Sequence, residues 1–109
     1  MANRCTVFTH FPSVFISRGC DGAIIPIYQV FTERFPTVTL DIDNFGSCPV
    51  TLIVQHQNSP DPIIRVVPPD RQISLTVNLV TNISVQCSNT PGGTCEFFVG
   101  LDVSGCICC

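Results

Sequence analysis

The chain has 109 residues, of which 45% are hydrophobic and 12% charged, and its formal net charge is −3. This is the length of one domain, and high hydrophobicity with few charges excludes an intrinsically disordered chain. The five cations are all arginines scattered along an acidic chain, which argues against a nucleic-acid partner. Proline, glycine, asparagine or glutamine interrupts every uncharged stretch, so none offers the ~20 apolar residues of a membrane helix.

The N-terminus shows no continuous apolar stretch and no small-residue cleavage site, so we expect no secretory signal peptide. Eight cysteines are nevertheless typical of chains in oxidising compartments. The combination leaves two explanations. Either the cysteines bind metal in the cytosol, or the protein leaves its cell by another route and is oxidised afterwards.

The hydrophobic pattern predicts strands along almost the whole chain. Segments 37–43, 71–77 and 82–86 alternate polar and apolar residues, as strands with one buried face do. Only residues 29–35 favour a short helix, which Pro36 would end. In chain order, the predicted strands are residues 12–18, 23–31, 37–43, 50–55, 62–67, 71–77, 82–86 and 97–103.

Turn-forming clusters rich in glycine, proline, asparagine and aspartate separate these strands. Short strands at this spacing are typical of a sandwich or barrel, and eight of them in one domain favour a jelly roll. We therefore predict an all-β, single-domain, eight-stranded jelly-roll sandwich at residues 12–104. A short extended N-terminal connector (1–11) would precede it, and a cysteine-rich C-terminal tail (105–109) would follow it.

Metal binding explains the cysteines poorly. A zinc site needs close pairs of ligands, and the only tight group is Cys106, Cys108 and Cys109, without a matching second group. His10 and His56 stand alone. A redox enzyme would place its reactive thiol at a helix N-terminus, and no helix is predicted near the cysteines. We expect no metal and no other cofactor, and disulfide bonds remain as the role of the cysteines.

Cys87 and Cys95 are the candidates for an intrachain disulfide. They flank the turn-forming segment 88–94, so a hairpin would set them side by side at the ~4 Å between Cβ atoms that a bridge needs. The alternative is that both are buried thiols that fill the end of a loop.

The candidates for disulfides between copies of the chain are Cys5, Cys20, Cys106, Cys108 and Cys109. The segment that carries Cys5 could stretch ~35 Å, beyond the edge of its own domain. Neighbouring residues of an extended tail point to opposite sides, so Cys108 and Cys109 need different partners. The alternative is that the tails fold back and bridge Cys20 or Cys48 of the same chain.

No catalytic arrangement is predicted, and we expect no enzyme. Asp41 and Asp43 alternate with apolar residues, which places them on a solvated strand face rather than in an acid–base pair. With Asn44 they form an oxygen cluster that could take calcium, but no EF-hand spacing follows them. The nucleophile motif G-x-S-x-G is missing from the sequence.

Several segments resemble the endospore appendage (Ena) subunits, which build pilus-like fibres on the surface of bacterial spores. The order of the segments carries the resemblance, which spans residues 13–104. The matching segments are 48–54 (CPVTLIV), 63–68 (IIRVVP), 73–77 (ISLTV), 80–85 (VTNISV) and 93–98 (GTCEFF).

The resemblance implies a jelly roll without enzymatic activity, whose copies associate by adding one sheet edge to the next. It also implies an N-terminal connector that forms disulfides in the adjacent layer; by position this is 1–11, with Cys5 as its cross-linking residue. Helical-fibre members carry a paired Cys-Cys in the connector. Here the pair is Cys108 and Cys109, so the ring-stacking, ladder-like members are the nearer analogy.

The resemblance also accounts for cysteines without a signal peptide, because a mother cell lyses and exposes its products to air, where they oxidise. The expected partners are copies of the chain itself, with other spore-surface proteins as anchor or tip. Two alternatives remain open. One is a cysteine-rich spore-coat or capsid-like shell protein. The other is a lectin-like jelly-roll module that binds calcium and sugar at residues 41–44.

Overall fold

The computed structural model describes residues 5–10, 12–29 and 36–108, with side chains in 12–29 and 36–104. Strands occupy most of these residues, and no helix is found among them. In chain order the strands are β1 (Cys5–His10), β2 (Ser13–Asp21), β3 (Ile24–Gln29), β4 (Thr37–Asn44), β5 (Val50–His56), β6 (Ile63–Val67), β7 (Gln72–Val77), β8 (Val80–Cys87) and β9 (Asn89–Cys108).

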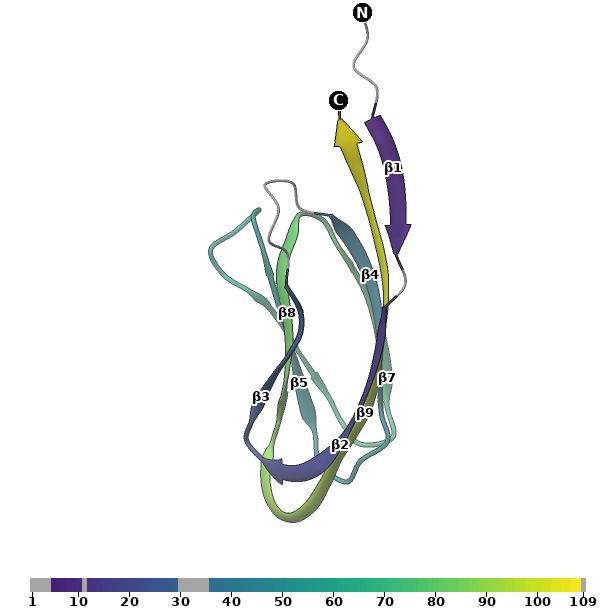
Figure 1. Cartoon of the computed structure of the whole chain (residues 1–109). Coiled ribbons are helices and arrows are strands. Elements are labelled where there is room, and N and C mark those ends of the chain that lie inside the picture. Colours follow the sequence, from purple (N-terminus) through teal and green to yellow (C-terminus); the bar gives the residue numbers. More distant parts are fainter. Residues whose placement is uncertain (1–4, 11, 30–35, 109) are drawn as a thin grey trace, which may run out of the picture.

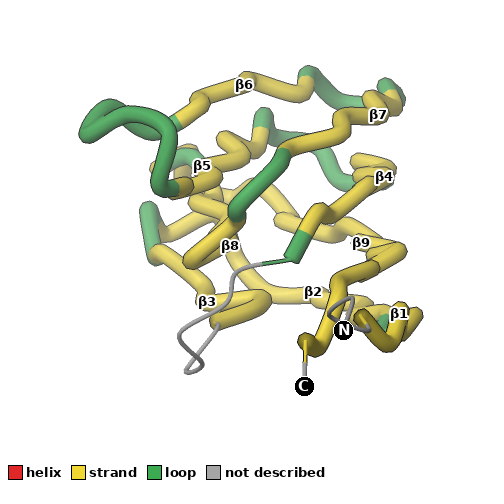
Figure 2. Tube along the Cα trace, turned by 90° about the horizontal axis from the view of Figure 1, so that it is seen from above, coloured by secondary structure: helices red, strands yellow, loops and turns green. Residues whose placement is uncertain are grey.

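The strands form two antiparallel sheets that face each other (Figures 1 and 2). Sheet A has the order β2-β9-β4-β7, and β1 pairs with the C-terminal part of β9 on the same edge as β2. Sheet B has the order β3-β8-β5-β6. The chain crosses between the sheets after β2, β3, β4, β6, β7 and β8, as in the double Greek key of a jelly roll. The predicted fold class is confirmed.

Alternating residues of both sheets meet in the core between them. In β4 and β5 the apolar positions of the alternating pattern are buried and the intervening ones face outward, as a strand with one covered face requires. Burying a Val, Leu, Ile or Phe side chain contributes about 1.5–3 kcal/mol. The largest fully buried side chains are Phe97, Leu40, Ile42, Leu52, Ile83, Val38, Val50, Val54, Val67, Val80, Val85 and Val99.

Two segments differ from the predicted strands. β9 begins at Asn89 instead of residue 97, because its first residues continue as a strand that pairs with the end of β2, where Asp21 faces Asn89. Residues 5–10, within the expected connector, form β1 against residues 103–108 of β9. A short helix was expected at residues 29–35. Gln29 ends β3, and residues 30–35 lie outside the described residues.

Candidate functional site: cysteines at the two ends of the sandwich

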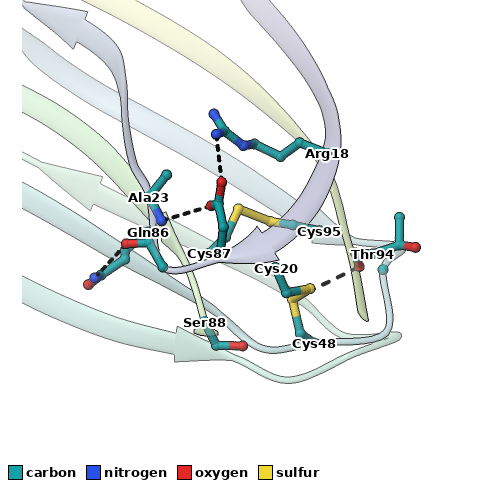
Figure 3. The surroundings of a disulfide bond; sticks show 12 residues. Arg18, Cys20, Ala23, Cys48, Gln86, Cys87, Ser88, Thr94 and Cys95 are labelled. Carbon is teal, nitrogen blue, oxygen red and sulfur yellow. Dashed lines mark hydrogen bonds and ion pairs between the residues drawn. A yellow bond between two sulfur atoms is a disulfide. The ribbon is translucent and has the colours of Figure 1, made fainter. Parts of the chain in front are cut away.

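Two disulfides lie together at one end of the sandwich, where the chain passes from β8 to β9 (Figures 1 and 3). Cys87 and Cys95 are bonded, with their Cα atoms 5.9 Å apart. Cys20 and Cys48 are bonded at a Cα separation of 6.6 Å. We call this region the arch end. The Cys87–Cys95 bridge joins sheet B to sheet A, and the Cys20–Cys48 bridge joins β2 of sheet A to the loop between β4 and β5, so the two disulfides close the sandwich here.

The Cys87–Cys95 bridge has the partners that the sequence indicated, but a hairpin does not bring them together. β8 belongs to sheet B and β9 to sheet A, and the two strands do not pair. The chain arches from one sheet to the other through Ser88, and the bridge spans the core at that point. Both cysteines are fully buried.

Cys20, grouped above with the candidates for bonds between copies, is instead bonded within the chain to Cys48. The end of β2 and the loop between β4 and β5 meet at the arch end, 28 residues apart in sequence. Both sulfurs are buried, since Cys20 is 5% exposed and Cys48 fully covered. A second copy of the chain therefore has no access to either sulfur.

Close backbone contacts hold the loop that carries Cys48. A Cβ atom on Gly46 would lie 2.3 Å from the Thr94 carbonyl oxygen, so only glycine fits there. The Ser47 and Thr94 backbones are joined by a hydrogen bond of 2.9 Å from Ser47 N to Thr94 O. A Cβ on Gly93 would lie 2.9 Å from the Cys20 sulfur. Glycines at these positions allow the loop and β9 to approach the disulfides.

Asn44 also supports the arch end, and this excludes it from the calcium site considered as an alternative for residues 41–44. Its side chain is 2% exposed and donates to the Cys48 and Val67 carbonyl oxygens at 2.9 and 3.0 Å. Its Oδ1 accepts a hydrogen bond from Gly46 N at 2.9 Å. Every polar atom of the side chain is thus occupied inside the protein, and none faces solvent.

Asp41 and Asp43 lie on the outer face of β4, as the alternation predicted. Asp41 accepts a hydrogen bond from the Ser74 hydroxyl on the neighbouring strand β7. No group of three or more His, Cys, Asp or Glu side chains suited to a metal ion occurs within the described part of the chain. With Asn44 turned inward, the oxygen cluster predicted at residues 41–44 is not formed.

The two histidines remain separate. The backbone of His10 lies in β1 opposite Val103, whereas His56 ends β5 in sheet B. The His56 Nδ1 atom is buried without a hydrogen-bond partner among the described atoms.

Asp21 is the described group whose pKa is clearly shifted. The backbone N–H of Ala23 and the Arg18 guanidinium, which lies 2.9 Å from the carboxylate, lower the pKa of Asp21 below its usual 3.8. Both side chains are exposed, in the last residues of β2, and Figure 3 shows Arg18 near the disulfides.

The opposite end of the sandwich carries the remaining described cysteines on a two-stranded extension of sheet A (Figure 1). We call residues 5–10 of β1 and 103–108 of β9 the ribbon. β4 pairs with β9 only as far as Ser104, so residues 105–108 have β1 as their partner among the described strands. The ribbon therefore projects past the body of the sandwich.

The backbone register of the ribbon sets Cys5 opposite Cys108, and Val7 opposite Cys106. Residues directly opposite in an antiparallel pair have Cα atoms about 4.5–5.5 Å apart, within the 4.4–6.8 Å that disulfides span. The positions of Cys5 and Cys108 on paired strands are thus compatible with a bridge between those two strands. Cys109 lies outside the described residues.

Of the described strands, four lie at the sides of the sandwich and pair with a neighbour on one side only. β2 and β3 lie at one side, and β6 and β7 at the other (Figure 2). β3 contains Pro26, and the Arg65 guanidinium donates to the carbonyl oxygen of Ile64 in β6. Both features hinder pairing with a further strand. β2 and β7 contain no proline.

No family model matches the sequence, and no curated protein matches it. A search of solved structures finds a chain from the Bacillus endospore appendages, which form a novel family of disulfide-linked pili. The two structures share 16% sequence identity and superpose with a TM-score of 0.64, covering 92% of this chain and 89% of that chain. The expected resemblance to endospore appendage subunits is confirmed as a likeness of fold. None of the described residues forms a helix that could cross a membrane.

Proposed function

We propose that the chain is a structural subunit that assembles with copies of itself into a disulfide-linked fibre on the surface of bacterial endospores. The observation that carries this proposal is the jelly roll that it shares, over nearly its whole length, with a subunit of disulfide-linked endospore pili. That relative is a structural protein, and we expect no enzymatic activity of this chain either.

The sides of the sandwich support lateral association. An exposed edge strand offers unpaired backbone groups to another chain, and lysines, other charges or prolines usually prevent such pairing. The chain has no lysine, and β2 and β7 lie at opposite sides of the sandwich. A contact between unlike sides repeats from copy to copy, which gives closed rings or open filaments. We assign lateral assembly to these two sides.

The ribbon supports covalent linkage between layers. A two-stranded ribbon is marginally stable in water, so β1 of one copy can give way to β1 of another at small cost. The exchanged strand would keep its register, with Cys5 opposite Cys108 of a different copy. Exchange of an identical element between copies is a common route to assembly. We assign the bonds between copies to Cys5, Cys106, Cys108 and Cys109.

The proposed function agrees with the expected location of the protein on the spore surface. Cysteines remain reduced in a mother-cell cytosol and oxidise on exposure to air. Disulfides formed at that stage would convert a reversible stack of subunits into a fibre that denaturants do not disperse. A binding module for calcium and sugar is disfavoured, because Asn44 is used entirely inside the protein.

The test is to oxidise the purified full-length chain in air and examine it by negative-stain electron microscopy and non-reducing gels. We expect filaments or stacked rings, and high-mass ladders that collapse on reduction. A single monomer band without polymers would contradict the proposal, and a soluble monomer that calcium stabilises would favour the binding module. A closed shell in the micrographs would favour the coat-protein alternative.

A further inference from the structure

The outer faces of the two sheets differ in charge. On sheet A the outward positions of β4 and β9 include four acidic residues, and the register places no basic residue at the outward positions of β2, β4, β7 and β9 whose side chains the structure describes. The acidic residues are Asp41, Asp43, Glu96 and Asp102. Two such faces would repel each other, and burying them would desolvate several carboxylates at high cost.

Among the described residues of sheet B, no charged side chain occupies an outward register position. Two rows of residues cross the four strands in the order β3, β8, β5, β6. The rows consist of Ile24, Gln86, Thr51 and Val66, and of Pro26, Ser84, Ile53 and Ile64. Ile24, Ile64 and Val66 are 59%, 52% and 60% exposed, which is unusual for three large aliphatic residues on one sheet face.

The arrangement of these rows is complementary to itself. Each row has an apolar residue on β3 and another on β6; between them lie Gln86 and Thr51 in the first row and Ser84 and Ile53 in the second. In a two-fold contact the same patch occurs on both partners. Whether β3 then faces β3 or β6 of the second copy, apolar residues meet apolar ones. Of the possible contacts between sheet faces of two copies, only that between two sheet B faces leaves no carboxylate desolvated.

We propose that the outer face of sheet B is a self-association surface, on which a second copy of the chain stacks face to face through the same residues. The stacking uses the face of the sheet, whereas the assembly proposed above uses its edges and the ribbon. The two contacts are therefore compatible in one polymer, and stacking of two subunits does not depend on the polymer.

The area of the outer face of sheet B determines how strongly single subunits and whole filaments associate through it. Four strands spaced about 4.8 Å apart, each contributing two or so outward residues, offer roughly 300 Å². A stable interface of standard size buries about 800 Å² on each partner. Two isolated subunits will thus pair weakly. Filaments that repeat the contact along their length gain avidity without any new interaction, and we expect them to associate side by side into bundles.

The test compares two lysine substitutions in the full-length chain. Ile64→Lys puts a charge in the centre of the β6 side of the face, and the side chain is exposed enough for lysine to be accommodated. Thr39→Lys, on the outer face of the central strand β4 in sheet A, adds the same charge away from sheet B and from the edge strands assigned to lateral assembly. Circular dichroism checks that both variants fold. Sedimentation velocity over a concentration series measures pairing of the unpolymerised fraction, and electron microscopy counts filaments per bundle.

For Ile64→Lys we expect the subunit dimer to weaken at least about tenfold, because the contact would bury an unpaired charge, and any filaments to separate. Thr39→Lys should retain the pairing of the wild type. Equal pairing in both variants, or a wild type that is monomeric at every concentration and never bundles, would overturn the inference. If no filaments form at all, the function proposed above fails, while the sedimentation data still decide the face-to-face contact.

Discussion

At the arch end four cysteines are buried between the sheets and bonded within the chain, whereas at the ribbon the cysteines lie on two strands that project past the sandwich. A disulfide inside the core restricts the unfolded chain and so stabilises one subunit. A cysteine on a ribbon with few neighbours contributes little to the core but is placed to meet another copy. We therefore expect the disulfides of the arch end to stabilise the single subunit, and disulfides of the ribbon to stabilise the polymer.

The largest effect is expected from Cys5→Ser, which should weaken the polymer and leave the subunit unchanged. We expect the subunit to fold and associate laterally as before, while fibres disperse in urea, because the proposed covalent link between layers is lost. Electron microscopy before and after urea treatment is the measurement. Full-length fibres that survive urea in the variant would contradict a cross-linking role for Cys5, and unchanged thermal unfolding of the subunit is the control.

Removing the arch-end bridges should have the opposite effect, on the subunit itself. The chain-entropy relation gives roughly 3.5 kcal/mol for the Cys20–Cys48 bridge and roughly 2.5 kcal/mol for the shorter Cys87–Cys95 loop. Paired alanine substitutions of each bridge, unfolded in urea, test these values. Alanine avoids the unsatisfied hydroxyl that serine would bury. A greater loss for the shorter loop would contradict the entropic account.

Asn44→Ala tests how the arch end contributes to subunit stability without changing a cysteine. The variant leaves the Cys48 and Val67 carbonyls and the Gly46 N–H without their partner inside the protein, which should cost about 3 kcal/mol of unfolding free energy. Asp43→Ala, one residue away on the outer face, is the matched control and should change stability by less than about 0.5 kcal/mol. Similar losses in both variants would show that the buried amide is not needed.

The smallest effect is expected at Asp21. Its pKa is lowered in the folded chain by Ala23 N–H and Arg18, so the charged form contributes stability above the ordinary pKa of 3.8. That contribution is lost as the pH falls through the lower pKa of the folded state. Asp21→Asn should therefore flatten the loss of thermal stability between pH 5 and pH 2. An unchanged pH profile would mean that the exposed pair contributes nothing measurable.

The sequence predicts the body of the fold well because burial enforces a period of two. In segment 37–43 each apolar position is buried in β4. The pairing of Cys87 with Cys95 could be predicted because the two residues are close in sequence. The pairing of Cys20 with Cys48 could not, since only the crossing of the chain between sheets brings them together.

The role of Asn44 was equally hidden. The alternation of β4 places Asn44 on the inner face with Leu40 and Ile42. The sequence does not show that its amide donates to the carbonyls of Cys48, four residues on, and of Val67, 23 residues on. The ribbon likewise depends on a pairing between the two ends of the chain, for which no local signal exists.

The most direct test of cross-linking between copies is disulfide mapping in a mixture of subunits. Reduced subunits labelled with ¹⁴N and with ¹⁵N are mixed, assembled and oxidised, and the bridged peptides are analysed by mass spectrometry. We predict light–heavy pairs, in the proportion of random mixing, for bridges that contain Cys5, and none for Cys87–Cys95 or Cys20–Cys48. Bridges of Cys5 that join only peptides of the same label would contradict the account.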